Sequence, residues 1–252
     1  MEIAYLDKNC VVVNKSPGES SEPLGRSGGG MTDLAPLLAE RLAGMENLPA
    51  PGKAPAGKSG FSPVAVHRLD VPVSGCVLFA RNPSALAFLN ARFRAGEVEK
   101  IYWGISEMPD PGREFPETGE LVHWLSQAGN KTTAYDEAGP GRKKAVLRYR
   151  VLGRGDRYLF LEIGLITGRH HQIRAQLARL GTPVKGDLKY GARRSEKGGG
   201  IRLHGYSIAF PDPAGTGLIR VKALPPRPDT LWEAFADCLN PGPPEALPCY
   251  TE

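Results

Sequence analysis

The chain has few cysteines and no long apolar segment. Its 252 residues include four cysteines, Cys10, Cys76, Cys238 and Cys249, which are widely spaced and form no C-x-x-C pair. Because no secretory signal precedes them, this pattern indicates a reducing, cytoplasmic location. The longest apolar runs, such as 158–166, are too short to cross a bilayer, so we expect a soluble protein without a membrane partner.

Extreme composition and internal repeats are also absent. Hydrophobic residues make up 41% of the chain and charged residues 23%, which excludes a wholly disordered chain. The formal net charge is +5 and the sequence pI is about 9.0. This excess of lysine and arginine suits a polyanionic partner such as RNA, although many basic proteins bind no nucleic acid.

Strand-like runs and short amphipathic helices alternate along the chain. Strands are predicted at 3–5, 11–13, 75–80, 98–105, 145–152, 158–166, 201–210 and 218–223. Helices are predicted from Thr32 or Asp33, with Leu34, Leu37, Leu38 and Leu42 on one face, and at 82–96, 171–181 and 230–237. The glycine-rich and proline-rich stretches 25–30, 49–60 and 198–200 are predicted to be loops.

An acid and a base stand together just before a predicted buried strand. The segment His67-Arg68-Leu69-Asp70 is followed by Val71-Pro72-Val73-Ser74-Gly75 and then by apolar residues. Loops at strand ends often hold functional side chains. Taken alone, the segment is more typical of a surface salt bridge between Arg68 and Asp70 at a turn.

Two further segments carry polar groups in structured positions. Gly168-Arg169-His170-His171-Gln172-Ile173-Arg174 leads into a predicted helix, where backbone donors and arginines can hold phosphate. A solvated basic helix start explains it equally well. Lys100-Ile101-Tyr102 lies on a predicted strand, where Tyr102 is by itself more typical of core packing.

Together the three segments resemble the RluA family of RNA pseudouridine synthases in residue type, order and spacing. Members typically carry H-R-L-D-x-x-T-S-G, then K-x-Y, then G-R-x-H-Q-I-R and finally G-D-x-x-Y-G, the last matched here by 186–191. The resemblance continues in 7–18, with its K-P-x-G-like turn, and in 203–211, so it covers nearly the whole chain.

The resemblance implies an isomerase that converts uridine in ribosomal or transfer RNA to pseudouridine without metal or cofactor. It implies an α+β fold with a mixed, mainly antiparallel sheet and flanking helices. We expect one catalytic domain at 1–240, a tail at 241–252, no separate N-terminal RNA-binding domain, and a monomer. Implied catalytic residues are Asp70, Tyr102 and Arg174, the last as the basic partner of Asp70; implied RNA contacts are His67, Arg68, Arg169, His171, Gln172 and Lys185.

Three departures from the family pattern leave these catalytic groups in place. Val73 stands where threonine is usual, Ser16 where proline is usual, and Gln176 where histidine often occurs. Whether Asp70 attacks the ribose or removes a ribose proton stays open. Two rival functions remain: an inactive RNA-binding protein on the same scaffold, and a metal hydrolase using His67, His170, His171 and His204, which no H-x-x-x-H pair supports.

Overall fold

The computed structural model describes residues 1–21, 32–45, 61–196, 199–215, 217–225 and 230–234. The predictions for 25–30 and 49–60, the tail at 241–252 and the second half of the helix at 230–237 lie outside these residues. The chain divides into two compact units. The first contains Met1–Lys100, Gly198–Gly200 and His204–Pro226, and the second contains the rest.

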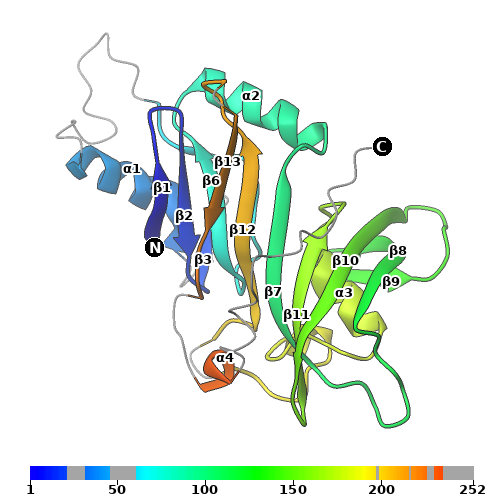
Figure 1. The fold of residues 1–252 in the computed structure, drawn as a ribbon. Helices are drawn as coiled ribbons and strands as arrows, with labels where there is room; N and C mark the ends of the chain where they lie inside the picture. Colours follow the sequence, from blue (N-terminus) through cyan, green and yellow to red (C-terminus); the bar gives the residue numbers. More distant parts are fainter. Residues whose placement is uncertain (22–31, 46–60, 197–198, 216, 226–229, 235–252) are drawn as a thin grey trace. The chain divides into compact units, whose positions relative to one another are not determined.

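The first unit is built on a mixed sheet (Figure 1). Its strands run in the order β1-β2-β6-β12, with β13 paired to β12 and β5 paired to β6. The strands are β1 (Glu2–Leu6), β2 (Cys10–Lys15), β5 (Val64–Ala65), β6 (Ser74–Ala80), β12 (Leu203–Pro211) and β13 (Leu218–Lys222). Only β6 and β12 pair in parallel among these described pairs; the others are antiparallel.

Helix α2 (Pro83–Arg94) covers part of this sheet, in contact with β6 (Figure 1). As the sequence predicts, Asn82 caps it: the Asn82 Oδ1 accepts a hydrogen bond from Ala85 N at 2.8 Å, and Pro83 opens the first turn. Leu89 is fully buried against the apolar residues of β2, β6 and β12. Every residue of β2 and β6 is buried, which explains their nearly continuous apolar sequence.

Helix α1 (Leu34–Met45) forms where predicted, but its buried face differs from the prediction in one residue. Leu34, Leu38, Leu42 and Ala39 are buried, whereas Leu37 is 40% exposed. At about 100° per residue, Leu37 points roughly 130° away from the centre of the arc that the buried residues share. The expectation that Leu37 faces the core was therefore wrong. Near this helix, β3 (Glu19–Ser20) and β4 (Thr32–Asp33) form a short parallel pair.

The second unit is an antiparallel sheet in the order β7-β11-β10-β8-β9. Its elements are β7 (Glu99–Glu107), β8 (Thr118–Ala128), β9 (Lys131–Tyr135), β10 (Lys143–Arg154), β11 (Tyr158–Leu165), α3 (Gln172–Arg179), the 3-10 turn η1 (Leu188–Tyr190) and α4 (Thr230–Glu233). The turn residues Gly153-Arg154-Gly155-Asp156 predict a hairpin between the strands at 145–152 and 158–166, and this is confirmed, since β10 and β11 pair antiparallel. Helix α3 packs on β8 and β9 (Figure 1).

A close backbone approach in the first unit fixes the strand that follows Asp70. Gly75 has φ +123°, and a Cβ placed on it would lie 2.3 Å from the nitrogen of Gly205 on β12. The two residues are partners in the parallel pairing of β6 and β12. Only glycine fits here, because a side chain would both strain the backbone and push β12 away.

Gly75→Ala is therefore expected to lower the free energy of unfolding by about 2–4 kcal/mol, through strain and lost strand pairing. Gly44→Ala is the matched control, because Gly44 lies in α1 and a methyl group added to it would have no other atom within 4 Å. Its stability should be unchanged or slightly higher. Urea unfolding of both variants measures the difference, and equal stabilities would contradict the tight approach.

Candidate active site

Asp70 lies on a tight loop between β5 and β6 in the first unit. The Val73 N–H donates to the Asp70 carbonyl at 3.0 Å, which closes a turn directly after the carboxylate. On the other side of Asp70, the Leu69 N–H donates to the Ser21 hydroxyl at 3.2 Å, and Leu69 is buried. Asp70 is half-buried, whereas Arg68 is exposed. The loop thus fixes its backbone on both sides of Asp70.

A buried lysine, which the sequence analysis did not single out, supports this loop. Lys15 is fully buried, and its ammonium donates to the carbonyls of Ser16 and Val71 at 3.1 Å each and to that of Val73. Burial lowers the pKa of Lys15 to about 8, and the nearby charges of Glu19 and Asp70 partly oppose that shift. Lys15 therefore ties the loop's backbone to β2.

His67 lies at the start of the same loop and contacts β6. Its Nε2 accepts a hydrogen bond from Leu78 N at 3.1 Å, and its ring stacks on Phe93 of α2 with 5.3 Å between centroids. Burial lowers the pKa of His67 to about 3, so the ring is neutral near pH 7. The structure places this predicted RNA contact as an anchor between the Asp70 loop and the sheet.

His204 on β12 is a second buried, neutral histidine in this unit. Its Nε2 donates to the Ala223 carbonyl at 2.8 Å, since a carbonyl oxygen can only accept. In the neutral ring Nδ1 then accepts from the Ser74 hydroxyl, also at 2.8 Å. Burial lowers the pKa of His204 to about 4. A proton on Nδ1 would face the hydroxyl of Ser74, in a site closed to water.

The lowered pKa of His204 predicts that the folded protein loses stability at acid pH. In the unfolded chain His204 takes up a proton near pH 6.5, but in the folded protein only near pH 4. The neutral ring therefore contributes its full stabilisation above pH 6.5, and this stabilisation is lost as the pH falls toward 4. The expected loss is about 1.4 kcal/mol per pH unit in that window. Urea unfolding at pH 6.5 and 5.0 should show a smaller drop for His204→Asn than for wild type. Equal drops would rule out the linkage.

In the second unit, Tyr102 is a buried residue of β7. It lies on β7 opposite Ile163 of β11 and is 7% exposed. Its neighbour along the strand, Trp103, packs edge-on against Phe160. The strand therefore holds Tyr102 in one position.

Arg174 on α3 forms a buried, two-pronged ion pair with Asp187. Its Nε and Nη2 donate to Oδ2 and Oδ1 of Asp187 at 2.6 and 2.9 Å. Both side chains are nearly inaccessible to solvent, at 5% and 2% exposed. A planar guanidinium held by two parallel bonds has a fixed orientation. Asp187, from the G-D-x-x-Y-G motif, is a site residue to which the sequence analysis gave no role.

Tyr190 joins Arg174 to the histidines at the start of α3. The Arg174 guanidinium lies 4.8 Å from the centre of the Tyr190 ring, and the Tyr190 hydroxyl is 2.8 Å from Nδ1 of His171. His171 has φ 49°, the only positive φ of a non-glycine residue in the described ranges. A left-handed residue at the start of a helix is strained, and such strain concentrates at functional sites.

The remaining predicted RNA contacts differ in accessibility. Arg169 is exposed, whereas Gln172 is 3% exposed and its Oε1 accepts from Arg169 N at 2.9 Å and from the Thr167 hydroxyl at 2.8 Å. Gln172 thus shapes the loop that presents Arg169. Lys185 is largely buried, in an ion pair with Glu196. Their contacts with RNA stay predictions.

The structure gives no geometry for a metal centre among the residues it describes. No group of three or more histidine, cysteine, aspartate or glutamate side chains in that part of the chain could hold an ion. The rings of His170 and His171 stack 3.8 Å apart, and their Nδ1 atoms face Thr132 and Tyr190 respectively.

Among the helices in the described part of the chain, none is long and apolar enough to cross a membrane.

Two of the departures from the family pattern are accommodated locally. Val73 is buried, and it contributes to the Asp70 loop through its backbone N–H and carbonyl, which any residue except proline supplies. Gln176 is fully buried, where its Nε2 donates to the Leu121 carbonyl at 3.0 Å and lies 3.0 Å from Nδ1 of His123.

The fold and the motifs are together typical of an isomerase that modifies RNA. Comparison with known proteins identifies the family. The sequence profile described as RNA pseudouridylate synthase matches residues 9–179. The chain therefore belongs to the RNA pseudouridylate synthase family, which confirms the predicted family and its class of enzyme, an isomerase of uridine in RNA.

Relatives and a solved structure agree with this assignment. An uncharacterised RNA pseudouridine synthase of Zymomonas mobilis is 28% identical over 82% of this chain and 85% of its own. The ribosomal large subunit pseudouridine synthase D of Borreliella burgdorferi is 30% identical over 82% of this chain, which spans 60% of that protein. The structure of human RNA pseudouridylate synthase domain containing 4 matches 94% of this chain and 92% of its own, with TM-score 0.69 and 21% identity, which confirms the predicted fold class.

Proposed function

We propose that the protein converts a uridine of structured RNA to pseudouridine and that Asp70 provides the catalytic carboxylate. The observation that carries this proposal is the Asp70 loop, whose backbone is fixed by Lys15 and by the Val73 turn while Asp70 itself is only half-buried. Ribosomal RNA is the first candidate substrate, because the Borreliella relative is named for the large ribosomal subunit. Transfer RNA is the second.

The reaction moves one bond and needs no redox partner. The bond between ribose C1′ and uracil N1 breaks, the base rotates, and C1′ joins C5 of the same base. The hydrogen on C5 then leaves as a proton while N1 gains one, so atoms and electrons balance. Asp70 either forms a transient ester with C1′ or removes a ribose proton as the first bond breaks.

Tyr102 is proposed to receive the uracil. Its ring offers a face for stacking, and its hydroxyl can relay the proton that leaves C5. A uridine inside a helix must leave the stack to be reached, at a cost of a few kcal/mol, and the exposed Arg68 can fill the gap it leaves.

Tyr102→Phe keeps the ring and removes the hydroxyl, so we expect the release of the C5 hydrogen to slow by about 10²-fold. The affinity for RNA should change little, because stacking persists. Tritium release from RNA labelled at uracil C5 measures the rate, and filter binding measures the affinity. A wild-type rate in Tyr102→Phe would remove the hydroxyl from the mechanism.

The function itself is tested with purified protein and unmodified RNA. Ribosomal and transfer RNA transcribed in vitro are incubated with the protein, and pseudouridine is mapped by carbodiimide adducts that stop reverse transcriptase. We expect one or a few uridines to be converted without added metal or cofactor. Tight RNA binding with no converted uridine would instead favour an inactive RNA-binding protein.

A further inference from the structure

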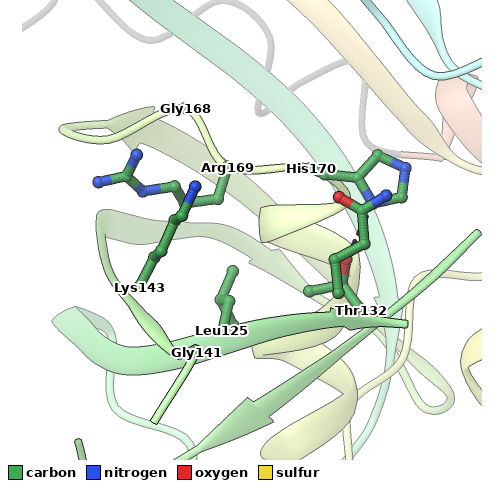
Figure 2. A pocket seen from close by; sticks show the side chains of 8 residues that line it. Leu125, Thr132, Gly141, Lys143, Gly168, Arg169 and His170 are labelled. Carbon is green, nitrogen blue, oxygen red and sulfur yellow. Dashed lines mark hydrogen bonds between the residues drawn. The ribbon is translucent and has the colours of Figure 1, made fainter. Parts of the chain in front are cut away.

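A pocket of about 410 Å³ opens in the second unit, and its lining includes none of Asp70, Tyr102 and Arg174 (Figure 2). Its lining comes from β8, the start of β9, the start of β10 and the loop before α3. The side chains that matter are Leu125, Thr132, Lys143, Arg169 and His170. A volume of this size is in the range of small-ligand sites and accommodates one nucleotide.

The pocket has two chemically different ends. Figure 2 shows Lys143 and Arg169 at one end and His170 with Thr132 at the other, with Leu125 between them. No aspartate or glutamate belongs to the lining that the described residues form. One end is therefore cationic, and the other presents the His170 ring beside Thr132, with the apolar Leu125 side chain between the two ends.

The cationic end of the pocket carries groups that can bind an anion. Arg169 is anchored through its Nε, which donates to the Lys144 carbonyl at 3.1 Å, and through its backbone N–H, which donates to Gln172. Its two Nη groups, and the ammonium of Lys143, have no hydrogen-bond or ion-pair partner among the described residues. Two uncompensated cations at one end of a pocket match a phosphate group.

The aromatic end is fixed by a chain of contacts that reaches Arg174. The Thr132 hydroxyl holds Nδ1 of His170 at 2.9 Å, and the His170 ring stacks on His171. His171 in turn contacts the Tyr190 hydroxyl, and Arg174 lies over the Tyr190 ring. An immobilised ring suits stacking with a base.

We propose that this pocket binds one nucleotide of the RNA other than the target uridine, with its phosphate between Lys143 and Arg169 and its base against His170. The inference rests on the proposed function, because it takes the substrate to be RNA. It assigns to these residues part of the affinity for the RNA outside the target nucleotide.

Adjacent lysines on β10 provide a matched test. Lys143 pairs across the sheet with Leu125, which lines the pocket, whereas Lys144 pairs with Trp124 and does not line it. Successive strand residues face opposite sides of the sheet, so Lys143→Gln and Lys144→Gln remove the same charge from opposite faces. Both side chains are exposed, and neither substitution should affect folding.

Single-turnover conversion of RNA is measured against enzyme concentration and salt for wild type, Lys143→Gln, Arg169→Gln and Lys144→Gln. We expect Lys143→Gln and Arg169→Gln each to raise the half-saturating concentration about fivefold, to lower the salt slope by about 1, and to leave the saturated rate unchanged. Lys144→Gln should behave as wild type. Equal effects of Lys143→Gln and Lys144→Gln, or no effect of either, would overturn the pocket while leaving the enzyme's function intact.

A second experiment distinguishes RNA from a free nucleotide as the ligand of this pocket. Millimolar adenosine 5′-monophosphate is expected to leave the saturated rate of wild type unchanged. A change in that rate which Lys143→Gln abolishes would assign the pocket to a free effector and contradict the proposal. Wild-type protein that neither binds nor converts RNA would contradict the proposed function itself, and the pocket assignment with it.

Discussion

Asp70→Asn is expected to lower the rate of pseudouridine formation by about 10⁴-fold or more, the size of effect seen when a nucleophile or its base is removed. Asparagine matches aspartate in size but carries no charge, so it neither attacks C1′ nor removes a ribose proton. Single-turnover release of tritium from RNA labelled at uracil C5 measures the loss directly. RNA affinity should stay within a few-fold of wild type.

The fold should tolerate this change, because the Asp70 loop is fixed through backbone groups. The Val73 turn and the Lys15 contacts use carbonyls and N–H groups that Asp70→Asn leaves in place. Asp110→Asn serves as the control for removing an acidic charge, since Asp110 is 79% exposed in a surface ion pair with Arg193. Residual activity of Asp70→Asn close to that of Asp110→Asn would exclude Asp70 as the catalytic carboxylate.

Breaking the ion pair of Arg174 and Asp187 is expected to cost about 3–5 kcal/mol of the free energy of unfolding. Arg174→Met would leave the Asp187 carboxylate buried and unpaired, and Asp187→Asn would leave the guanidinium with weaker partners. The double variant Arg174→Met/Asp187→Asn should recover part of the loss, because no isolated charge remains buried. Urea unfolding of all three variants measures the coupling.

An exposed pair in the same unit gives the matched control. Arg148 and Glu120 lie 2.8 Å apart on β10 and β8 and are 30% and 42% exposed. Water screens such a pair, so Arg148→Met should cost no more than about 1 kcal/mol. If Arg174→Met were as mild as Arg148→Met, the buried pair would not be what stabilises α3 against the 186–191 segment.

Local sequence patterns were sufficient for most elements and for the loop that carries Asp70. Asn82-Pro83 marked the start of α2, and the turn residues between β10 and β11 marked their hairpin. These features depend on neighbours within a few residues, so they can be predicted from the sequence. The exposure of Leu37 could not be predicted from such neighbours, because the elements that pack against α1 decide which of its faces is buried.

The supporting contacts of the site could not be predicted in this way. Lys15 reaches Val71 and Val73, which are 56 and 58 residues away along the chain, and nothing in the K-S-P-G turn indicates that its ammonium is buried. The pairing of Arg174 with Asp187 joins a helix to a separate loop. The motifs predicted a role for Arg174 but none for Lys15 or Asp187, because those contacts exist only in the three-dimensional structure.

The most direct test of the central claim is pseudouridine mapping of total RNA from cells with and without the gene. The gene is restored either as wild type or as Asp70→Asn. We expect at least one uridine to lose its modification when the gene is removed and to regain it only with the wild-type protein. Restoration by Asp70→Asn, or a map that does not change when the gene is removed, would contradict the central claim.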